Sequence, residues 1–144
     1  MKIRNTMFLL LLGFSVSCQS SGYYQTSESL APADELNETL LKDIVVTLQN
    51  NFLPAKTRFF FPHRGEKLAI ALEASLRKYG YALSLDAKHR EKNDLQLAYK
   101  FSEVEPGIFV LRVVAGEAFQ INRLYQQTKA GEYLAAGPLL LRRG

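Results

Sequence analysis

Apolar residues recur at helical spacing in two stretches of the chain, residues 34–52 and residues 65–79. A repeat every three or four positions places side chains on one face of an α-helix, so both stretches predict amphipathic helices. Pro54 ends the first helix, because proline cannot continue it, and Gly80 follows the second at the left-handed position that often closes a helix. The aliphatic residues of the two faces are Leu36, Leu40, Ile44, Leu48, Leu68, Leu72 and Leu76.

The rest of the pattern predicts β-strands. Residues 57–61 are rich in aromatic residues and residues 81–85 follow Gly80, so the second helix lies between two strands in a β-α-β unit over residues 57–85. After a charged connection at residues 86–94, which we expect to be exposed, apolar and polar residues alternate with the period of a half-buried strand. The strands predicted there are residues 95–101, 108–115, 119–125 and 133–141, the last an edge strand interrupted by Gly137-Pro138.

These elements predict an α+β fold in which two helices pack on a mainly antiparallel sheet of about five or six strands. We expect residues 34–144 to form this fold as a single domain. Hydrophobic residues make up 47% of the chain, which is enough for a core of that size. The chain holds one cysteine, so it cannot form an internal disulfide.

The N-terminus has the pattern of a secretory signal peptide. Lys2 and Arg4 give it a positive start, residues 7–14 are apolar, and small residues follow at 15–17 before Cys18. The apolar run is much shorter than the ~18 residues that a membrane-spanning helix requires. We therefore expect residues 1–17 to be removed as a signal peptide.

Cys18 indicates which kind of signal this is. The residues around it resemble the lipobox of bacterial lipoproteins, although Ser15 stands where that motif prefers leucine. The resemblance implies that Cys18 becomes the first residue of the mature protein and is acylated. Residues 18–33, which are polar and without periodicity, would then be the lipidated N-terminus and a flexible tether. A secretory signal with an incidental cysteine and a buried N-terminal helix are the alternatives.

Charge and motifs exclude several classes of function. The net charge is +4, of which Lys2 and Arg4 supply two, and the longest basic run is Arg142-Arg143, so we expect no direct binding to nucleic acid. His63 and His89 lie in predicted loops, where we expect them to be exposed, and no metal-ligand spacing surrounds them. The chain has no hydrolase or phosphate-loop motif and no close pair of carboxylates. We therefore expect no enzyme activity, metal, cofactor or small-molecule substrate.

Arg123 is the charged residue whose position stands out. It falls on the strand face that it shares with Ile121 and Tyr125, a face otherwise suited to burial. A buried arginine needs a partner, whereas an arginine at the surface among aromatic residues indicates a protein interface. We name Arg123, Tyr125 and Tyr133 as candidate interface residues. The alternative is an edge-strand arginine whose head group lies in water.

Several short motifs occur in a fixed order along the chain. They are Cys18, Leu53-Pro54-Ala55-Lys56-Thr57, Leu76-Arg77-Lys78-Tyr79-Gly80-Tyr81, Leu97-Ala98-Tyr99, Arg123-Leu124-Tyr125 and Ala136-Gly137-Pro138. Together they resemble the TrbH family of conjugal transfer lipoproteins. Each motif is weak alone, and their joint order over nearly the whole chain carries the resemblance.

The resemblance implies a lipid-anchored structural component of a conjugative type IV secretion, or mating-pair formation, apparatus. Such a protein would be held in the outer membrane through acylated Cys18, face the periplasm and dock onto subunits of the channel core. The family carries no catalytic residues, so none are transferred to this chain. The alternative is a free-standing, periplasm-facing lipoprotein that binds a small ligand or inhibits an envelope enzyme.

Overall fold

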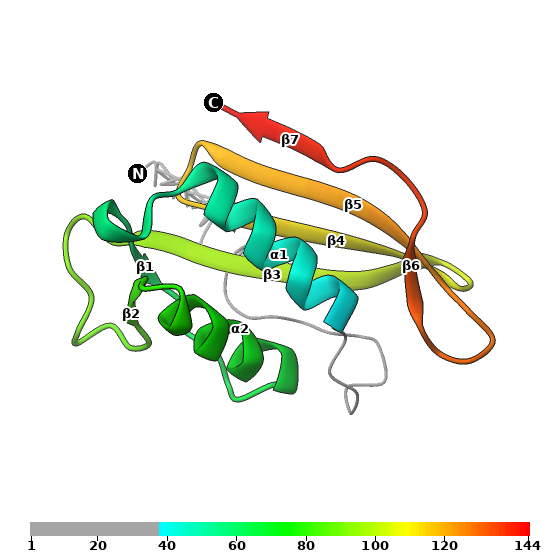
Figure 1. The fold of residues 1–144 in the computed structure, drawn as a ribbon, viewed down its shortest axis with the longest axis horizontal. Coiled ribbons are helices and arrows are strands. Elements are labelled where there is room, and N and C mark those ends of the chain that lie inside the picture. The colour runs from blue at the N-terminus through cyan, green and yellow to red at the C-terminus, as the bar shows by residue number, and fades with distance from the viewer. Residues whose placement is uncertain (1–37) are drawn as a thin grey trace, which may run out of the picture.

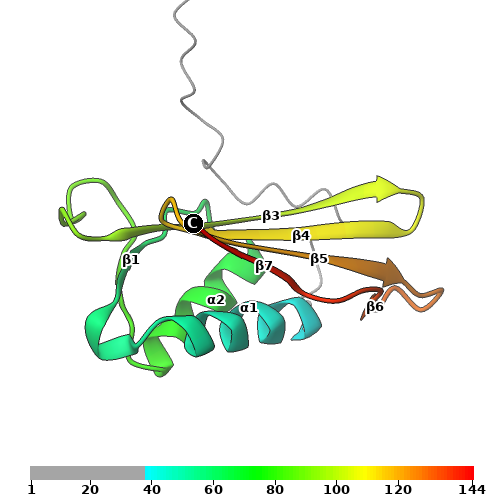
Figure 2. The same cartoon turned by 90° about the horizontal axis from the view of Figure 1, so that it is seen from above.

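Two helices cover one face of a mixed β-sheet in the computed structural model, which describes residues 38–144 (Figure 1). Figure 2 shows that both helices lie on the same side of the sheet. The predictions about residues 1–37, including the signal peptide, Cys18 and the tether, lie outside the described residues. The elements are α1 (Glu38–Asn51), η1 (Pro54–Lys56), β1 (Arg58–Phe60), α2 (Lys67–Lys78), β2 (Ala82–Ser84), β3 (Leu95–Glu105), β4 (Ile108–Ala115), β5 (Phe119–Gln127), β6 (Tyr133–Ala135) and β7 (Leu140–Arg143).

The predicted α+β fold with a mainly antiparallel sheet is confirmed. The strands follow the order β2-β1-β3-β4-β5, and β6 and β7 both pair with β5. The parallel pairings are those of β1 with β2 and with β3, and all the others are antiparallel. The parallel contact between β1 and β3 joins the β-α-β unit to the antiparallel part of the sheet.

The β-α-β unit is confirmed within a few residues of its predicted bounds. Arg58 lies beside Ala82 in a parallel pair, and α2 connects the two strands. Gly80 ends α2 with a φ of 87°, as predicted, because a residue without Cβ adopts this left-handed conformation at no steric cost. The N–H of Tyr81 donates to the carbonyl of Leu76 at 3.0 Å, which satisfies one of the last helical carbonyls.

The interrupted edge strand is also confirmed. β6 pairs with the end of β5, where Tyr133 lies beside Gln127, and β7 pairs with its beginning, where Arg143 lies beside Phe119. Gly137-Pro138 falls between the two strands, where proline removes no ladder hydrogen bond. Together β6 and β7 form the outer edge of the sheet next to β5.

The core lies between the helices and the sheet. Alternate residues of the long strands point toward the helices, and the register places Phe101 beside Leu111 and Tyr99 beside Val113. The predicted helical faces are buried, with Ile44 of α1 and Leu72 of α2 both at 0% exposure. Burial of such a side chain stabilises the fold by about 1.5–3 kcal/mol relative to leaving it exposed. The apolar faces of both helices pack on one face of β3, β4 and β5. The register of these strands therefore decides which of their polar side chains point toward the helices.

Candidate functional site

Arg123 and Tyr125 meet Asp43 of α1 in one polar cluster, which we call the Arg123 cluster. Both β5 residues point toward the helices, and Tyr125 is fully buried. Arg123 Nη1 donates to Asp43 Oδ2 at 2.9 Å, and the Tyr125 hydroxyl donates a hydrogen bond to the same oxygen. Residues about 80 positions apart thus join α1 to the sheet through one carboxylate.

A third contact extends the Arg123 cluster to the edge of the sheet. Arg123 Nε donates to the carbonyl of Gly137, 3.3 Å away, in the break between β6 and β7. The side chains of Arg123 and Asp43 are 25% and 20% exposed, so water reaches both members of the ion pair. Hydrogen bonds to a charged group contribute about 1.5–3 kcal/mol, and partial exposure places this pair at the low end.

The Tyr125 hydroxyl is held in its protonated form. Burial raises the pKa of Tyr125 far above its usual value, and the hydrogen bond to Asp43 and the charge of that carboxylate act in the same direction. The guanidinium of Arg123 opposes the shift without cancelling it. Tyr125 is therefore a fixed donor to Asp43 across the physiological range and is unsuited to act as a base.

Tyr133, the third candidate interface residue, lies in an aromatic group next to the Arg123 cluster. Its ring meets those of Phe101 and Phe109 edge to face, with centroids 5.1 and 5.0 Å apart. Its side-chain hydroxyl accepts a hydrogen bond from Gln127 Nε2 at 3.3 Å, and the residue is 7% exposed. Burial raises the pKa of Tyr133, and the charge of Glu103 adds to the shift. Of the three candidates, Arg123 is the one with substantial exposure.

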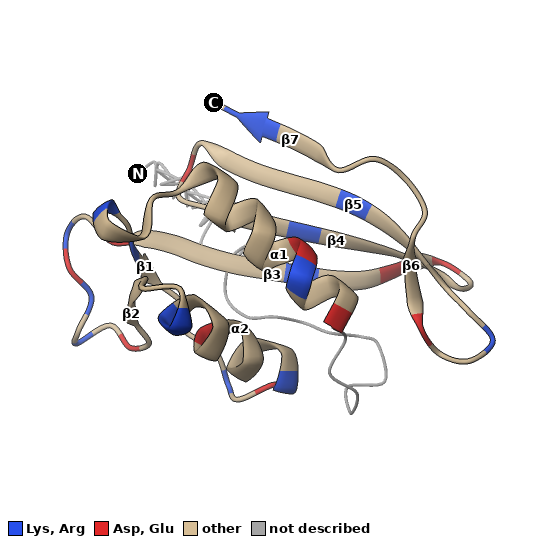
Figure 3. Cartoon of the chain, in the orientation of Figure 1, with Lys and Arg blue, Asp and Glu red and all other residues tan. Residues whose placement is uncertain are grey.

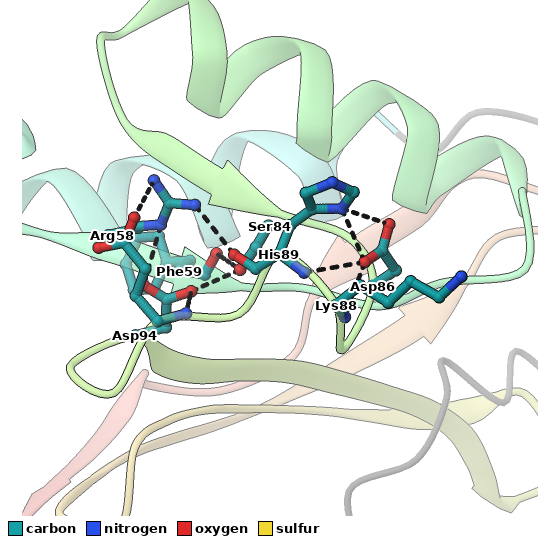
Figure 4. A network of polar contacts seen from close by, with 8 residues as sticks. Arg58, Phe59, Ser84, Asp86, Lys88, His89 and Asp94 are labelled. Atoms are coloured by element: carbon teal, nitrogen blue, oxygen red, sulfur yellow. Dashed lines mark hydrogen bonds and ion pairs between the residues drawn. The ribbon is translucent and has the colours of Figure 1, made fainter.

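A second polar cluster, the Asp94 network, fixes the connection between β2 and β3 (Figure 4). The Asp94 side chain is 1% exposed, and its Oδ2 accepts hydrogen bonds from Ser84 Oγ at 2.5 Å and from the N–H of Glu91 at 3.0 Å. Its Oδ1 lies 3.0 Å from Arg58 Nε as an ion pair. Burial acts to raise the pKa of Asp94, but the hydrogen bonds and the charge of Arg58 hold it below its usual value.

Arg58 extends the Asp94 network along the connection. Its guanidinium lies 3.1 Å from Glu91 Oε1 and donates to the backbone carbonyl of His89 at 3.1 Å. The carboxylate of Asp86 in turn accepts hydrogen bonds from the N–H groups of Lys88 and His89. The expectation of an exposed connection is therefore right for His89 and its neighbours and wrong for Asp94, which is buried because β1 brings Arg58 beside it.

His63 also departs from the expected exposed loop. Its side chain is 9% exposed, and Nε2 lies 3.1 Å from Glu73 Oε2 of α2. The N–H of Gly65 donates to Nδ1 at 3.2 Å, so the neutral ring carries its proton on Nε2 and donates it to Glu73. Glu73 also forms an ion pair with Arg77 at 2.8 Å. Burial acts to raise the pKa of Glu73, but Arg77 and His63 hold it below its usual value. His63 joins the loop before α2 to that helix.

The polar side chains described here hold secondary-structure elements together. Within residues 38–144, no three His, Cys, Asp or Glu side chains are grouped so that they could hold a metal ion. Over the same residues, neither helix has the length and apolar character needed to cross a membrane. Sequence reasoning did not identify Asp43, Arg58 or Asp94. Arg58 begins β1 and Asp94 directly precedes β3, and the pairing of these two strands is what brings the side chains together.

The fold and its polar clusters define a small α+β protein with two helices fixed to an open mixed sheet, in which β6 and β7 are the outer strands among the described residues. A family model described as conjugal transfer protein TrbH matches residues 19–144, so the chain belongs to the TrbH family. Membership indicates a role in conjugation, in association with a transfer apparatus of the cell envelope. No curated protein and no solved structure matches the chain.

Proposed function

We propose that this protein is a lipid-anchored structural component of a conjugative type IV secretion apparatus. Acylated Cys18 would hold it in the outer membrane, with its folded part facing the periplasm and docked onto subunits of the channel core. The observation that carries the proposal is the family match, which spans residues 19–144 and begins directly after Cys18. Each buried CH₂ of an acyl chain contributes ~0.8 kcal/mol to attachment, so two or three chains anchor a protein firmly.

The outer edge of β7 supports docking by strand addition. The N–H of Gly144 donates to the carbonyl of Ala118 at 2.7 Å, and hydrogen-bonded positions alternate along an antiparallel pair. The backbone groups of Leu141 and Arg143 therefore point away from β5. An extended segment of another protein can pair with such groups, and exposed Leu141 (43%) offers it an apolar contact.

The candidate interface residues fit this edge with unequal roles. Arg123 bonds the carbonyl of Gly137 where β6 ends and is partly exposed, so a docked partner could contact it directly. Tyr125 and Tyr133 are buried and would act by holding β5 and β6 in place. We therefore expect neither tyrosine to contact a partner directly.

Substitution of the cysteine tests the anchor. Cys18→Ser should abolish incorporation of a labelled fatty acid, release the protein from the membrane fraction and reduce the frequency of DNA transfer between cells. Ser17→Ala is the matched control, because it keeps a small residue before the cysteine. Unchanged membrane association and transfer in Cys18→Ser would overturn the anchoring proposal.

Substitution in β7 tests the docking. Leu141→Pro removes an N–H that points away from β5, whereas Leu141→Ala keeps the N–H and removes the side chain. With folding checked by circular dichroism, crosslinking in donor cells should recover channel-core subunits with the Ala variant and lose them with the Pro variant. Recovery of only the protein itself, or of a single envelope enzyme, would instead support the free-standing lipoprotein.

A further inference from the structure

The face of the sheet that points away from the helices, here called the open face, combines basic and apolar side chains. Lys100, Arg112 and Arg142 point to this side, because each alternates with residues that face the helices. Figure 3 shows the basic residues of β4 and β7 in blue. Among the described strand positions of this face, Glu105 beside the β3–β4 turn is the only carboxylate. The face therefore suits an anionic occupant.

The register of β3 and β4 adds to the preference of the open face for an anionic occupant. Lys100 lies directly opposite Arg112, and like charges in directly opposed positions of neighbouring strands disfavour the sheet. Arg112 Nε donates to Asn122 Oδ1 at 3.0 Å, a neutral acceptor that leaves its charge uncompensated. A carboxylate placed over this face would compensate the charge of Arg112.

The open face also carries apolar side chains, some buried and some exposed. Ala98 and Val114 are 9% and 6% exposed, although neither helix of the described chain covers this side of the sheet (Figure 2). Leu124 and Leu134, on the same face, remain 43% and 56% exposed. An occupant of this face would thus need apolar as well as acidic side chains.

Residues 19–37 of the same chain have this composition. They contain Glu28, Asp34 and Glu35 and no lysine or arginine, and Tyr23 and Tyr24 add aromatic surface. The segment leads directly into α1, so it is covalently held near the sheet, and tethering raises its effective concentration there. At ~3.3–3.6 Å per extended residue it reaches about 60 Å, more than the roughly 36 Å length of β3.

We propose that residues 19–37 bind the open face of the sheet, with their carboxylates over Lys100, Arg112 and Arg142. This inference goes beyond the proposed docking at β7 and does not depend on acylation of Cys18. Binding would hold the chain between Cys18 and α1 against the sheet. Where Cys18 is acylated as proposed above, binding would also set the distance between the folded part and the membrane. An acidic partner segment of similar composition would compete for the same surface.

Proteolysis of the full chain tests the proposal. Chymotrypsin cuts after Tyr23 and Tyr24, and bound segments are cut slowly, so the cleavage rate reports release from the sheet. In a Cys18→Ser background, which removes membrane attachment, Lys100→Glu with Arg112→Glu should speed this cleavage up to about tenfold, as expected for two partly exposed ion pairs. Asp34→Lys with Glu35→Lys should do the same.

The combined variant with all four reversals distinguishes pairing from general charge effects. It should return the cleavage rate to within about twofold of the starting chain, because the opposite charges are again matched. Lys88→Glu, which reverses a charge in the exposed connection between β2 and β3, is the control and should leave the rate unchanged. Equal rates in all variants, or no rescue by the combined variant, would overturn the proposal.

Discussion

Within residues 38–144, two arginine–aspartate pairs hold neighbouring elements together in different surroundings. In the Asp94 network the carboxylate is 1% exposed and accepts hydrogen bonds from Ser84 and a backbone N–H as well as facing Arg58. In the Arg123 cluster, Asp43 is 20% exposed and water can reach it. The first pair fixes the loop between β2 and β3, and the second fixes α1 to β5. Burial rather than the identity of the charges should decide how much each contributes to stability.

The largest effect is expected at Asp94. Asp94→Ala leaves the Ser84 hydroxyl and the N–H of Glu91 without their acceptor and removes the buried partner of Arg58. Breaking such a site costs about 3 kcal/mol of unfolding free energy, which urea denaturation followed by circular dichroism measures.

A carboxylate in the same connection provides the control for this prediction. Asp86 is 56% exposed, so Asp86→Ala should leave the urea midpoint almost unchanged. Similar losses in Asp86→Ala and Asp94→Ala would show that burial of the carboxylate does not determine its contribution.

Arg123 should have an intermediate effect. Arg123→Ala removes the bonds to Asp43 and to the carbonyl of Gly137, but water can solvate the remaining carboxylate, so the expected loss is about 1–2 kcal/mol. Arg64→Ala, which removes an exposed arginine from the loop before α2, is the control, and a loss within about 0.5 kcal/mol is expected. A double-mutant cycle of Arg123→Ala with Asp43→Ala should give a coupling near 1 kcal/mol. A coupling of zero would mean that the contact between Arg123 and Asp43 does not stabilise the folded protein.

The difference between the two pairs also shows what sequence reasoning can reach. The helical faces, the β-α-β unit and the edge strand broken at Gly137-Pro138 were predictable, because each follows from a periodicity or a turn residue within about thirty positions. Arg123 could be recognised as unusual for the same local reason, since it interrupts an apolar alternation. The sequence also indicated that a buried arginine there would need a partner.

The partners themselves were beyond the reach of such patterns. Asp43 and Arg123 are about 80 positions apart, and their meeting depends on how α1 crosses β5. Asp94 lies in a charged run that is exposed elsewhere, and it becomes buried only because β1 pairs in parallel with β3. The side chain of His63 is 9% exposed and lies against Glu73 for a similar reason, through the packing of α2. The burial of a charged residue cannot be predicted from periodicity along the sequence, because it depends on a partner elsewhere in the chain.

The smallest effect is expected in acid, and it again separates the two pairs. The pKa of Asp94 is lowered in the folded protein, so its ionised form stabilises the fold fully above the ordinary carboxylate pKa near 4. That contribution is lost as the pH falls through the lower, folded-state pKa. Asp94→Asn cannot titrate at this site, so its stability should fall less steeply than that of the parent between about pH 5 and pH 2. Glu73, whose pKa is also lowered, gives both proteins a shared background slope. Parallel curves of unfolding free energy against pH for the two proteins would show that the Asp94 network does not hold the carboxylate ionised. Electrostatics would then not explain why the Arg58–Asp94 pair should contribute more than the Arg123–Asp43 pair.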